Sequence, residues 1–280
     1  MKSSVEIAEN LQCEAQALWH QGVCAKRPES IKLLSKALLI LRRLSKIWDS
    51  RTNLEKWLKI QSDIGLVLLE ISYCYKGGER ASPLKKAVRS ARRPLLILQR
   101  RATPCQLAIA QFRLAQFLDW HASALNSSES SHLWEQSLHH CHRALSEVSE
   151  ENSPEFRASI WLTIISIRGK QILGKRGTEA MLMLKRAVDD CRITIALLDE
   201  GKNSMMWSTA QGLLGETLER MGSLKKGGAR MILWLEAREH LLAGLSVFPL
   251  PDYPGMDQEL LDRLERLEQK IERSKAGVNS

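Results

Sequence analysis

The sequence of 280 residues repeats itself with a period of 50 residues, five times over. Residues whose numbers differ by 50 are of the same kind at several positions of the repeat, and each such set of five residues is called a column below. One column holds helix N-cap residue types: Ser3, Asn53, Thr103, Ser153 and Asn203. Internal repetition in this range is typical of solenoids, in which each unit packs only on its neighbours. The period therefore predicts one repeat array rather than a single globular core.

Each unit is predicted to form two antiparallel helices, called helix A and helix B below. Helix A begins after the N-cap column, and Pro104 and Pro154 occupy the first helical position that proline favours. A further column, which we expect to mark the end of helix A, holds residues suited to a left-handed turn: Gly77, Ser127, Gly177 and Gly227. Pro94 falls inside the second helix B and is expected to bend it.

Three columns indicate how the two helices pack. The middle of helix A is small in four copies: Ala15, Gly65, Ala115, Ile165 and Gly215. The middle of helix B is small in all five: Ala37, Ala87, Ser137, Ala187 and Ala237. A column of helix A is large and apolar except in the fourth unit: Leu18, Leu68, Leu118, Arg168 and Leu218. Small residues at both midpoints allow the paired helices to approach closely.

The sequence thus predicts an all-α fold, a right-handed α-solenoid of five two-helix repeats (units 1–50, 51–100, 101–150, 151–200 and 201–250). Residues 251–280 are expected to form a Pro-rich loop, a capping helix and a short disordered tail. The apolar face expected for that helix consists of Leu260, Leu261, Leu264, Leu267 and Ile271. An isolated helix is marginal in water, so it should dock near Trp234, Leu241 and Leu245. That it binds a partner instead remains open.

The fifth unit carries a motif of six residues followed by Leu218, Ala237 and Gly244: Ala210-Gln211-Gly212-Leu213-Leu214-Gly215. With it the chain resembles tetratricopeptide repeat proteins, in their long prokaryotic variant. The third unit, from Ala110-Gln111 to Leu118, is a second match. The usual unit is shorter, about 34 residues. The resemblance implies protein–protein interaction and no chemistry of its own.

Composition narrows the classes of protein further. The N-terminus has no apolar signal sequence, and no apolar run approaches the ~18 residues of a membrane span. Six cysteines are present and none forms a C-x-x-C, which favours reduced thiols in the cytoplasm. A net charge of +9 permits acidic partners or nucleic acid without requiring either.

Partner-binding candidates follow from fixed offsets of −3, +1, +4 and +5 from the small column of helix A, the helix expected to line the concave groove. They include Ser62 and Leu66 in the second unit. The predicted groove residues are Trp19, Phe112, Gln116, Trp120, Lys170 and Arg220. Aromatic and arginine side chains dominate binding hot spots. The alternative is that the three aromatic residues are packing residues of long helices.

Basic residues also recur in register on helix B. This basic ridge consists of Arg42, Arg43, Arg92, Arg93, Arg143 and Arg192. Stacked repeats would place such residues about 10 Å apart, which suits an acidic partner or a nucleic-acid backbone. Nucleic-acid binding is therefore the alternative function, although no nucleic-acid-binding motif is present.

The sequence contains no pattern for catalysis. Consecutive histidines around Cys141 point in different directions on a helix, so the four converging ligands of structural zinc are not expected. Asp189 and Asp190 are expected on a solvated helix face. We therefore predict a non-catalytic protein-interaction module (a scaffold, adaptor or regulator) in the cytoplasm, with another protein as partner and with no cofactor, metal or membrane contact.

Overall fold

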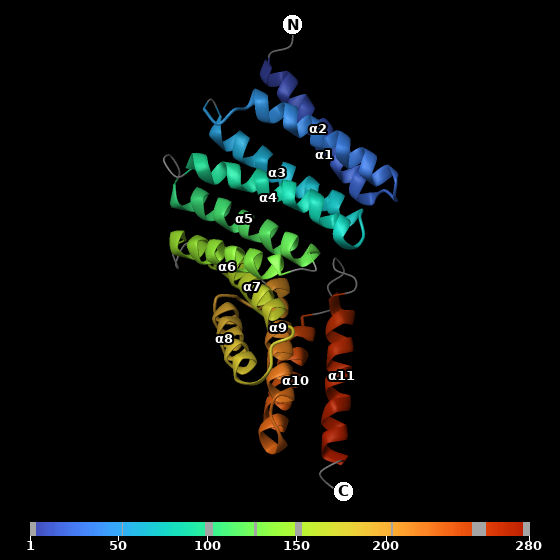
Figure 1. The fold of residues 1–280 in the computed structure, drawn as a ribbon, viewed down its shortest axis with the longest axis vertical. Helices are drawn as coiled ribbons and strands as arrows, with labels where there is room; N and C mark the ends of the chain where they lie inside the picture. The colour runs from blue at the N-terminus through green and yellow to red at the C-terminus, as the bar shows by residue number, and fades with distance from the viewer. Residues whose placement is uncertain are drawn as a thin grey trace. The chain divides into compact units, whose positions relative to one another are not determined.

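The structure is a computed structural model that describes residues 4–51, 53–98, 103–125, 128–148, 153–202, 204–247 and 256–276. Within these ranges the chain forms α-helices α1 to α11 and one 3-10 helix, η1, and it contains no strand (Figure 1). The chain divides into two compact units, Met1–Glu147 and Val148–Ser280. The all-α prediction is confirmed.

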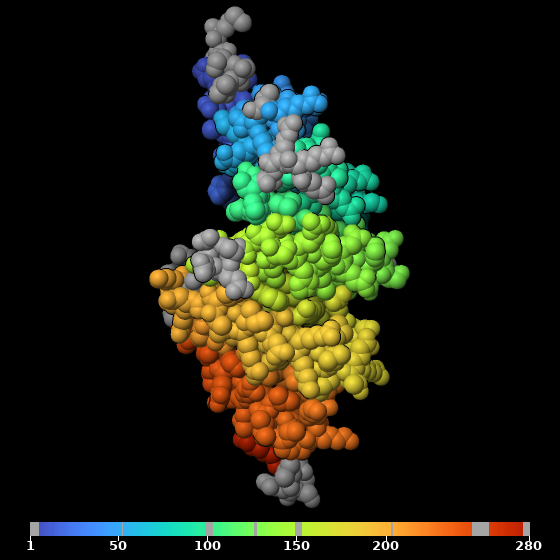
Figure 2. All heavy atoms as spheres, turned by 90° about the vertical axis from the view of Figure 1, so that its left-hand side faces the viewer, coloured from blue at the N-terminus to red at the C-terminus, as the bar shows by residue number. Residues whose placement is uncertain are grey.

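The N-terminal unit contains three helix pairs. The first is α1 (Ser4–Cys24) with α2 (Glu29–Ile47), the second is α3 (Leu54–Tyr73) with α4 (Ala81–Leu98), and the third is α5 (Pro104–Ala124) with α6 (Glu129–Glu147). The helix η1 (Gly77–Arg80) precedes α4. Each helix packs on the next, and in the space-filling view the colours of this unit follow one another from blue to green (Figure 2).

The C-terminal unit contains two helix pairs and a last helix. The pairs are α7 (Pro154–Ile172) with α8 (Gly177–Ala196), and α9 (Ser204–Ser223) with α10 (Gly227–Leu245). The last helix, α11 (Met256–Ala276), packs on α10 and α9. In both units, therefore, the chain is an array of antiparallel helix pairs, as the period of the sequence predicts.

Helix A begins after the predicted N-cap residue at Asn53, Thr103 and Ser153, but the side chain forms a capping hydrogen bond only at the first two of these. The Asn53 side chain accepts a hydrogen bond from the Lys56 backbone N–H at 3.2 Å. Thr103 and Gln106 cap each other's backbone N–H groups at the start of α5. Ser3, Ser127, Asn203, the predicted Pro-rich loop up to residue 255 and the tail from residue 277 lie outside the described residues.

The glycine column has a different role from the one predicted. Gly77, Gly177 and Gly227 have φ angles of 52°, 61° and 56°, so the expected left-handed conformation is present. However, these glycines begin η1, α8 and α10, whereas the preceding helices already end at Tyr73, Ile172 and Ser223. The glycine therefore turns the chain into helix B, and the prediction that it ends helix A is wrong.

The small columns lie where helices A and B touch. Ala37, Ala87, Ser137 and Ala237 are fully buried. A Cβ atom on Gly215 would lie 2.8 Å from Leu241 Cγ and 3.0 Å from the Ala237 carbonyl oxygen on α10. A larger side chain at this position would therefore force the two helices apart, which is the physical reason for the column.

The last helix is docked on its own chain. Leu264, Leu267 and Ile271 are buried in the same cluster as Trp234 and Leu241. Leu260 reaches α9, where a Cβ atom on Gly212 would lie 2.6 Å from Leu260 Cδ2. Leu261 was expected on this apolar face, but it is exposed, so that part of the prediction is wrong. Ion pairs flank the contact, including Arg238–Glu268 at 3.1 Å and Lys270–Glu219 at 2.5 Å.

Candidate partner-binding site

The predicted groove residues of the N-terminal unit lie partly inside its core. Phe112 is only 8% exposed, and Trp19 and Trp120 are half-buried against the core cluster. The Trp120 ring packs on Phe117, with 5.5 Å between ring centroids. Gln116 is half-buried and accepts a hydrogen bond from Arg113 Nη1 at 3.1 Å. Much of the surface of these aromatic side chains is therefore buried in packing contacts and is not available to a partner.

The two predicted groove residues of the C-terminal unit lie together. Lys170 and Arg220 line one pocket of about 260 Å³ between α7, α9 and α11. Arg220 Nη1 donates a hydrogen bond to the Gly169 carbonyl at 3.3 Å and lies 4.0 Å from Glu216. Glu216 also pairs with Arg263 of the last helix. A surface shared by all six predicted residues would span both units and stays a prediction.

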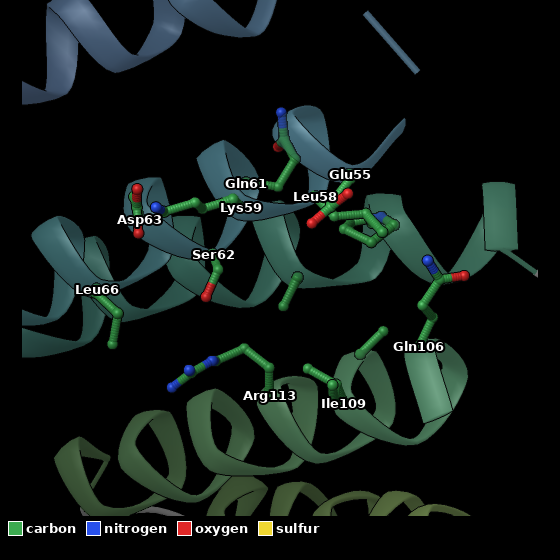
Figure 3. A pocket seen from close by; sticks show the side chains of 13 residues that line it. Glu55, Leu58, Lys59, Gln61, Ser62, Asp63, Leu66, Gln106, Ile109 and Arg113 are labelled. Carbon is green, nitrogen blue, oxygen red and sulfur yellow. The ribbon is translucent and has the colours of Figure 1, made fainter. Parts of the chain in front are cut away.

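A larger pocket of about 450 Å³ lies between two successive A helices of the N-terminal unit. We call it the α3–α5 pocket. Figure 3 shows Ser62 and Leu66 reaching into it from α3, opposite Arg113 and Ile109 from α5. Ser62 and Leu66 are the −3 and +1 positions relative to Gly65, so two predicted groove positions do line this pocket.

The pocket exists because α3 and α5 both pack on α4, which forms its floor. That floor consists of Ala91 and Pro94, two short side chains that leave the space above them open. The α4 helix continues through Pro94 to Leu98. Apolar walls are provided by Leu58, Leu66 and Ile109, and Ile109 is 50% exposed. An exposed apolar wall over a shallow floor can accept an apolar side chain.

Charged residues of both signs line this pocket: Glu55, Lys59, Asp63 and Arg113. Burial raises the pKa of Asp63, and the nearby Lys59 and Arg113 oppose that rise. Burial likewise lowers the pKa of Arg113, opposed by Asp63. Partial removal of both groups from water strengthens their electrostatic contacts with any third polar group. The pocket therefore offers an acceptor, a donor and an apolar surface, which suits binding a peptide segment more than catalysis.

A polar contact that the sequence reasoning missed lies inside the α7–α8 pair. Asp190 is 6% exposed and forms an ion pair with Arg168, so the prediction that it lies on a solvated face is wrong. Asp189, its neighbour, is exposed as expected. The signal was present, because Arg168 replaces a leucine in the large apolar column. The column of helix B that contains Asp190, called the partner column below, also changes residue type between units: Ile40, Ser90, His140, Asp190 and His240.

The same partner column forms hydrogen bonds in two other helix pairs. His140 Nδ1 lies 2.5 Å from Gln111 Oε1, and His240 Nδ1 lies 2.7 Å from Gln211 Oε1. Burial is the largest cause that lowers the pKa of His140 to about 4, with His139 and arginines adding to it. The imidazole is therefore neutral at pH 7, and this polar contact belongs to the helix interface.

The basic ridge is partly neutralised by the protein itself. Arg92 Nη2 donates to Gln136 Oε1 at 3.1 Å, and Arg192 Nη2 lies 3.0 Å from Glu236 Oε1. Arg93 stacks over the Trp57 ring at 6.0 Å. Arg42, Arg43 and Arg143 are exposed. The ridge is therefore not a uniform line of available cations.

The cysteines are free thiols, and burial is the main cause that raises the pKa of Cys141 and of Cys191 to about 12. Such thiols are poor nucleophiles and poor metal ligands at neutral pH. Among the described residues, no three His, Cys, Asp or Glu side chains converge as metal ligands would. None of the helices in the described ranges has the length and hydropathy that a membrane crossing requires.

Several solved structures are similar to this chain in fold. One is a circular tandem repeat protein with a novel repeat topology and enhanced subunit contact surfaces, at 13% identity and a TM-score of 0.39 over 98% of this chain and 74% of that chain. Another is the complex of the TPR2AB domain of yeast Sti1 with pHSP90, at 12% identity and a TM-score of 0.32 over 95% and 98%.

At such identities and TM-scores the likeness carries no conclusion about family or function. The predicted array of helix pairs is confirmed by the helices of the structure itself. No protein-family model matches the sequence, and no curated protein matches it either.

Proposed function

We propose that this chain is a non-catalytic protein-interaction module, a scaffold, adaptor or regulator in the cytoplasm, that binds a segment of a partner protein on its A helices. The observation that carries the proposal is the α3–α5 pocket of about 450 Å³, whose apolar walls stand beside a carboxylate and a guanidinium. Pockets of this size with a few placed polar groups are the usual sites of ligand anchoring.

The pocket chemistry indicates how such a segment would be held. An apolar side chain of the partner would fill the space above Ala91 and Pro94. Asp63 and Arg113 would then be within reach of the partner's backbone N–H and C=O groups, or of its charged side chains. Because both charged groups are already partly removed from water, binding would require little further desolvation of them.

Selection of peptides from a random displayed library on the full chain tests the proposal. Affinities of the selected peptides are then measured for the wild type, for Ser62→Trp, which fills the pocket, and for Ser123→Trp. Ser123 is exposed on α5 and does not line the pocket, so its variant controls for an added indole.

We expect Ser62→Trp to weaken binding roughly thirtyfold, as blocking a central anchor does, and Ser123→Trp to leave it unchanged. Circular dichroism melts confirm that both variants are folded. Peptides that bind Ser62→Trp as tightly as the wild type would refute the site. Selection that yields no enriched sequence would count against the function itself.

The alternative function, nucleic-acid binding along the basic ridge, has less support from the geometry. Phosphate backbones are neutralised by series of available cations. Arg92 and Arg192 instead direct their guanidinium groups to Gln136 and Glu236 of the next helix B.

A further inference from the structure

Two contacts between successive B helices repeat at the same separation in sequence. Arg92 on α4 binds Gln136 on α6, and Arg192 on α8 binds Glu236 on α10, in both cases 44 residues apart. In each contact the earlier B helix provides a guanidinium and the later one an oxygen acceptor. The repeat thus contains a bridge between neighbouring B helices.

Among the described residues, the bridge is missing between α2 and α4 because a second cation occupies the acceptor position. Arg42 occupies the arginine position of α2, and the acceptor position of α4 holds Lys86. Both residues line two adjoining cavities, of about 500 Å³ and 230 Å³, which also share Leu68 of α3. Two cations therefore stand where the α4–α6 and α8–α10 intervals hold a cation and its acceptor.

Further basic residues surround the second cavity. Arg89 and Arg93 line it together with the hydroxyl-bearing Ser90. Glu79 lines the first cavity and is, among the described residues, the one acidic residue lining either of them. Within the described ranges, Arg42, Lys86 and Arg89 have neither a hydrogen-bonding acceptor for their side chains nor an ion-pair partner. Like charges gathered in this way favour an anion from outside.

We propose that this groove, the Arg42–Lys86 groove, binds an acidic segment of a partner protein. A partner carboxylate would take the place that Glu236 takes beside Arg192, bridging Arg42 and Lys86. The groove shares only Gln61 with the lining of the α3–α5 pocket, so the proposal stands even if that pocket binds nothing.

The extent of the charge favours an acidic peptide over nucleic acid. The equivalent arginines of the α4–α6 and α8–α10 intervals have acceptors, whereas Arg42, Lys86 and Arg89 are gathered around one groove. The groove floor is apolar, with Leu38, Leu68 and Ile71, and Tyr75 is the one aromatic residue lining it. A short carboxylate-bearing segment with apolar neighbours matches these dimensions, whereas nucleic-acid strands are bound by longer basic tracks with aromatic stacking platforms.

Fluorescence anisotropy with a labelled hexaglutamate peptide tests the proposal. The full chain is compared with Lys86→Gln, which restores the residue type of Gln136, and with the double variant Arg42→Gln, Lys86→Gln. The control is Lys185→Gln, which removes the same charge from an exposed site on α8. A hexaglutamine peptide and an oligothymidylate of equal charge serve as competitors.

We expect Lys86→Gln to weaken hexaglutamate binding roughly two- to fivefold and the double variant roughly tenfold. Lys185→Gln and the pocket variant Ser62→Trp should bind as the wild type does, and hexaglutamine should not compete. Equal losses in Lys86→Gln and Lys185→Gln would overturn the proposal, because binding would then follow net charge alone. Stronger competition by oligothymidylate would overturn it in favour of nucleic acid.

A second variant tests the groove without any ligand. Lys86→Glu should form the bridge to Arg42 that Glu236 forms to Arg192, so it should raise the melting temperature and abolish hexaglutamate binding. A lower melting temperature together with unchanged binding would show that residues 42 and 86 do not act together.

Discussion

Replacing Arg168 by leucine is expected to destabilise the C-terminal unit, although leucine is the residue that the other four repeats carry in this column. The reason is Asp190, which is 6% exposed and forms an ion pair with Arg168 across the α7–α8 interface. Without Arg168 the carboxylate remains buried beside an aliphatic side chain. A substitution toward the repeat consensus is therefore predicted to be harmful.

The magnitude follows from the burial of both partners. Removing one member of a buried ion pair costs about 3–5 kcal/mol, mostly because the other charge is left without compensation. At about 4 °C per kcal/mol for a domain of this size, the melting temperature should fall by about 12–20 °C. Replacing both residues, as Arg168→Leu with Asp190→Ile, recreates the residues of the first unit, Leu18 and Ile40, and should recover most of the loss.

Calorimetry on the full chain measures the transitions of the wild type, the two single variants and the double variant. Arg192→Leu is the matched control, because its pair with Glu236 is exposed and should contribute less than about 1 kcal/mol. If Arg168→Leu melts like Arg192→Leu, or if the double variant is less stable than both single variants, the assigned role of the pair is wrong.

Two further predictions concern the pH dependence of stability and the last helix. Since the folded pKa of His140 is lowered to about 4 from 6.5, its stabilising contribution is present above pH 6.5 and is lost as the pH falls toward 4. Urea titrations between these pH values should show a smaller decrease in the free energy of unfolding for His140→Gln than for the wild type. Deleting residues 251–280 uncovers the apolar cluster around Trp234 and should lower the melting temperature and promote association in light scattering. A truncated chain that stays monomeric and melts normally would contradict the capping role.

The sequence predicts the helix pairs well because the period is carried by residues with strong local preferences. Asn53 and Thr103 cap helices where expected, and Gly215 lies at a close helix contact. The position of glycines such as Gly177 relative to the helices is less predictable. A residue with left-handed backbone conformation can follow the end of one helix or begin the next, and both arrangements are compatible with a short turn.

The errors about function have a different physical origin. Helical periodicity places Asp190 beside Asp189 on a polar stripe, yet its partner Arg168 lies on another helix. The α3–α5 pocket depends on the distance between two A helices that pack on α4, and a single column of residues does not encode that distance. Only Ser62 and Leu66 could be expected to line it. Phe112 is 8% exposed, and its role in binding stays a prediction.

The polar contacts inside the helix pairs also bear on how the chain avoids misassembly. Repeats share their apolar columns, so an A helix can bury its apolar face on a B helix from the wrong repeat. The His–Gln contact recurs in the α5–α6 and α9–α10 pairs, and these pairs could exchange partners without losing it. Arg168 and Asp190 occur once, and α8 paired with α9 would place Asp190 against Leu218. Domain-swapped or misfolded forms of this protein are therefore expected to exchange α5, α6, α9 and α10, while α7 and α8 stay together.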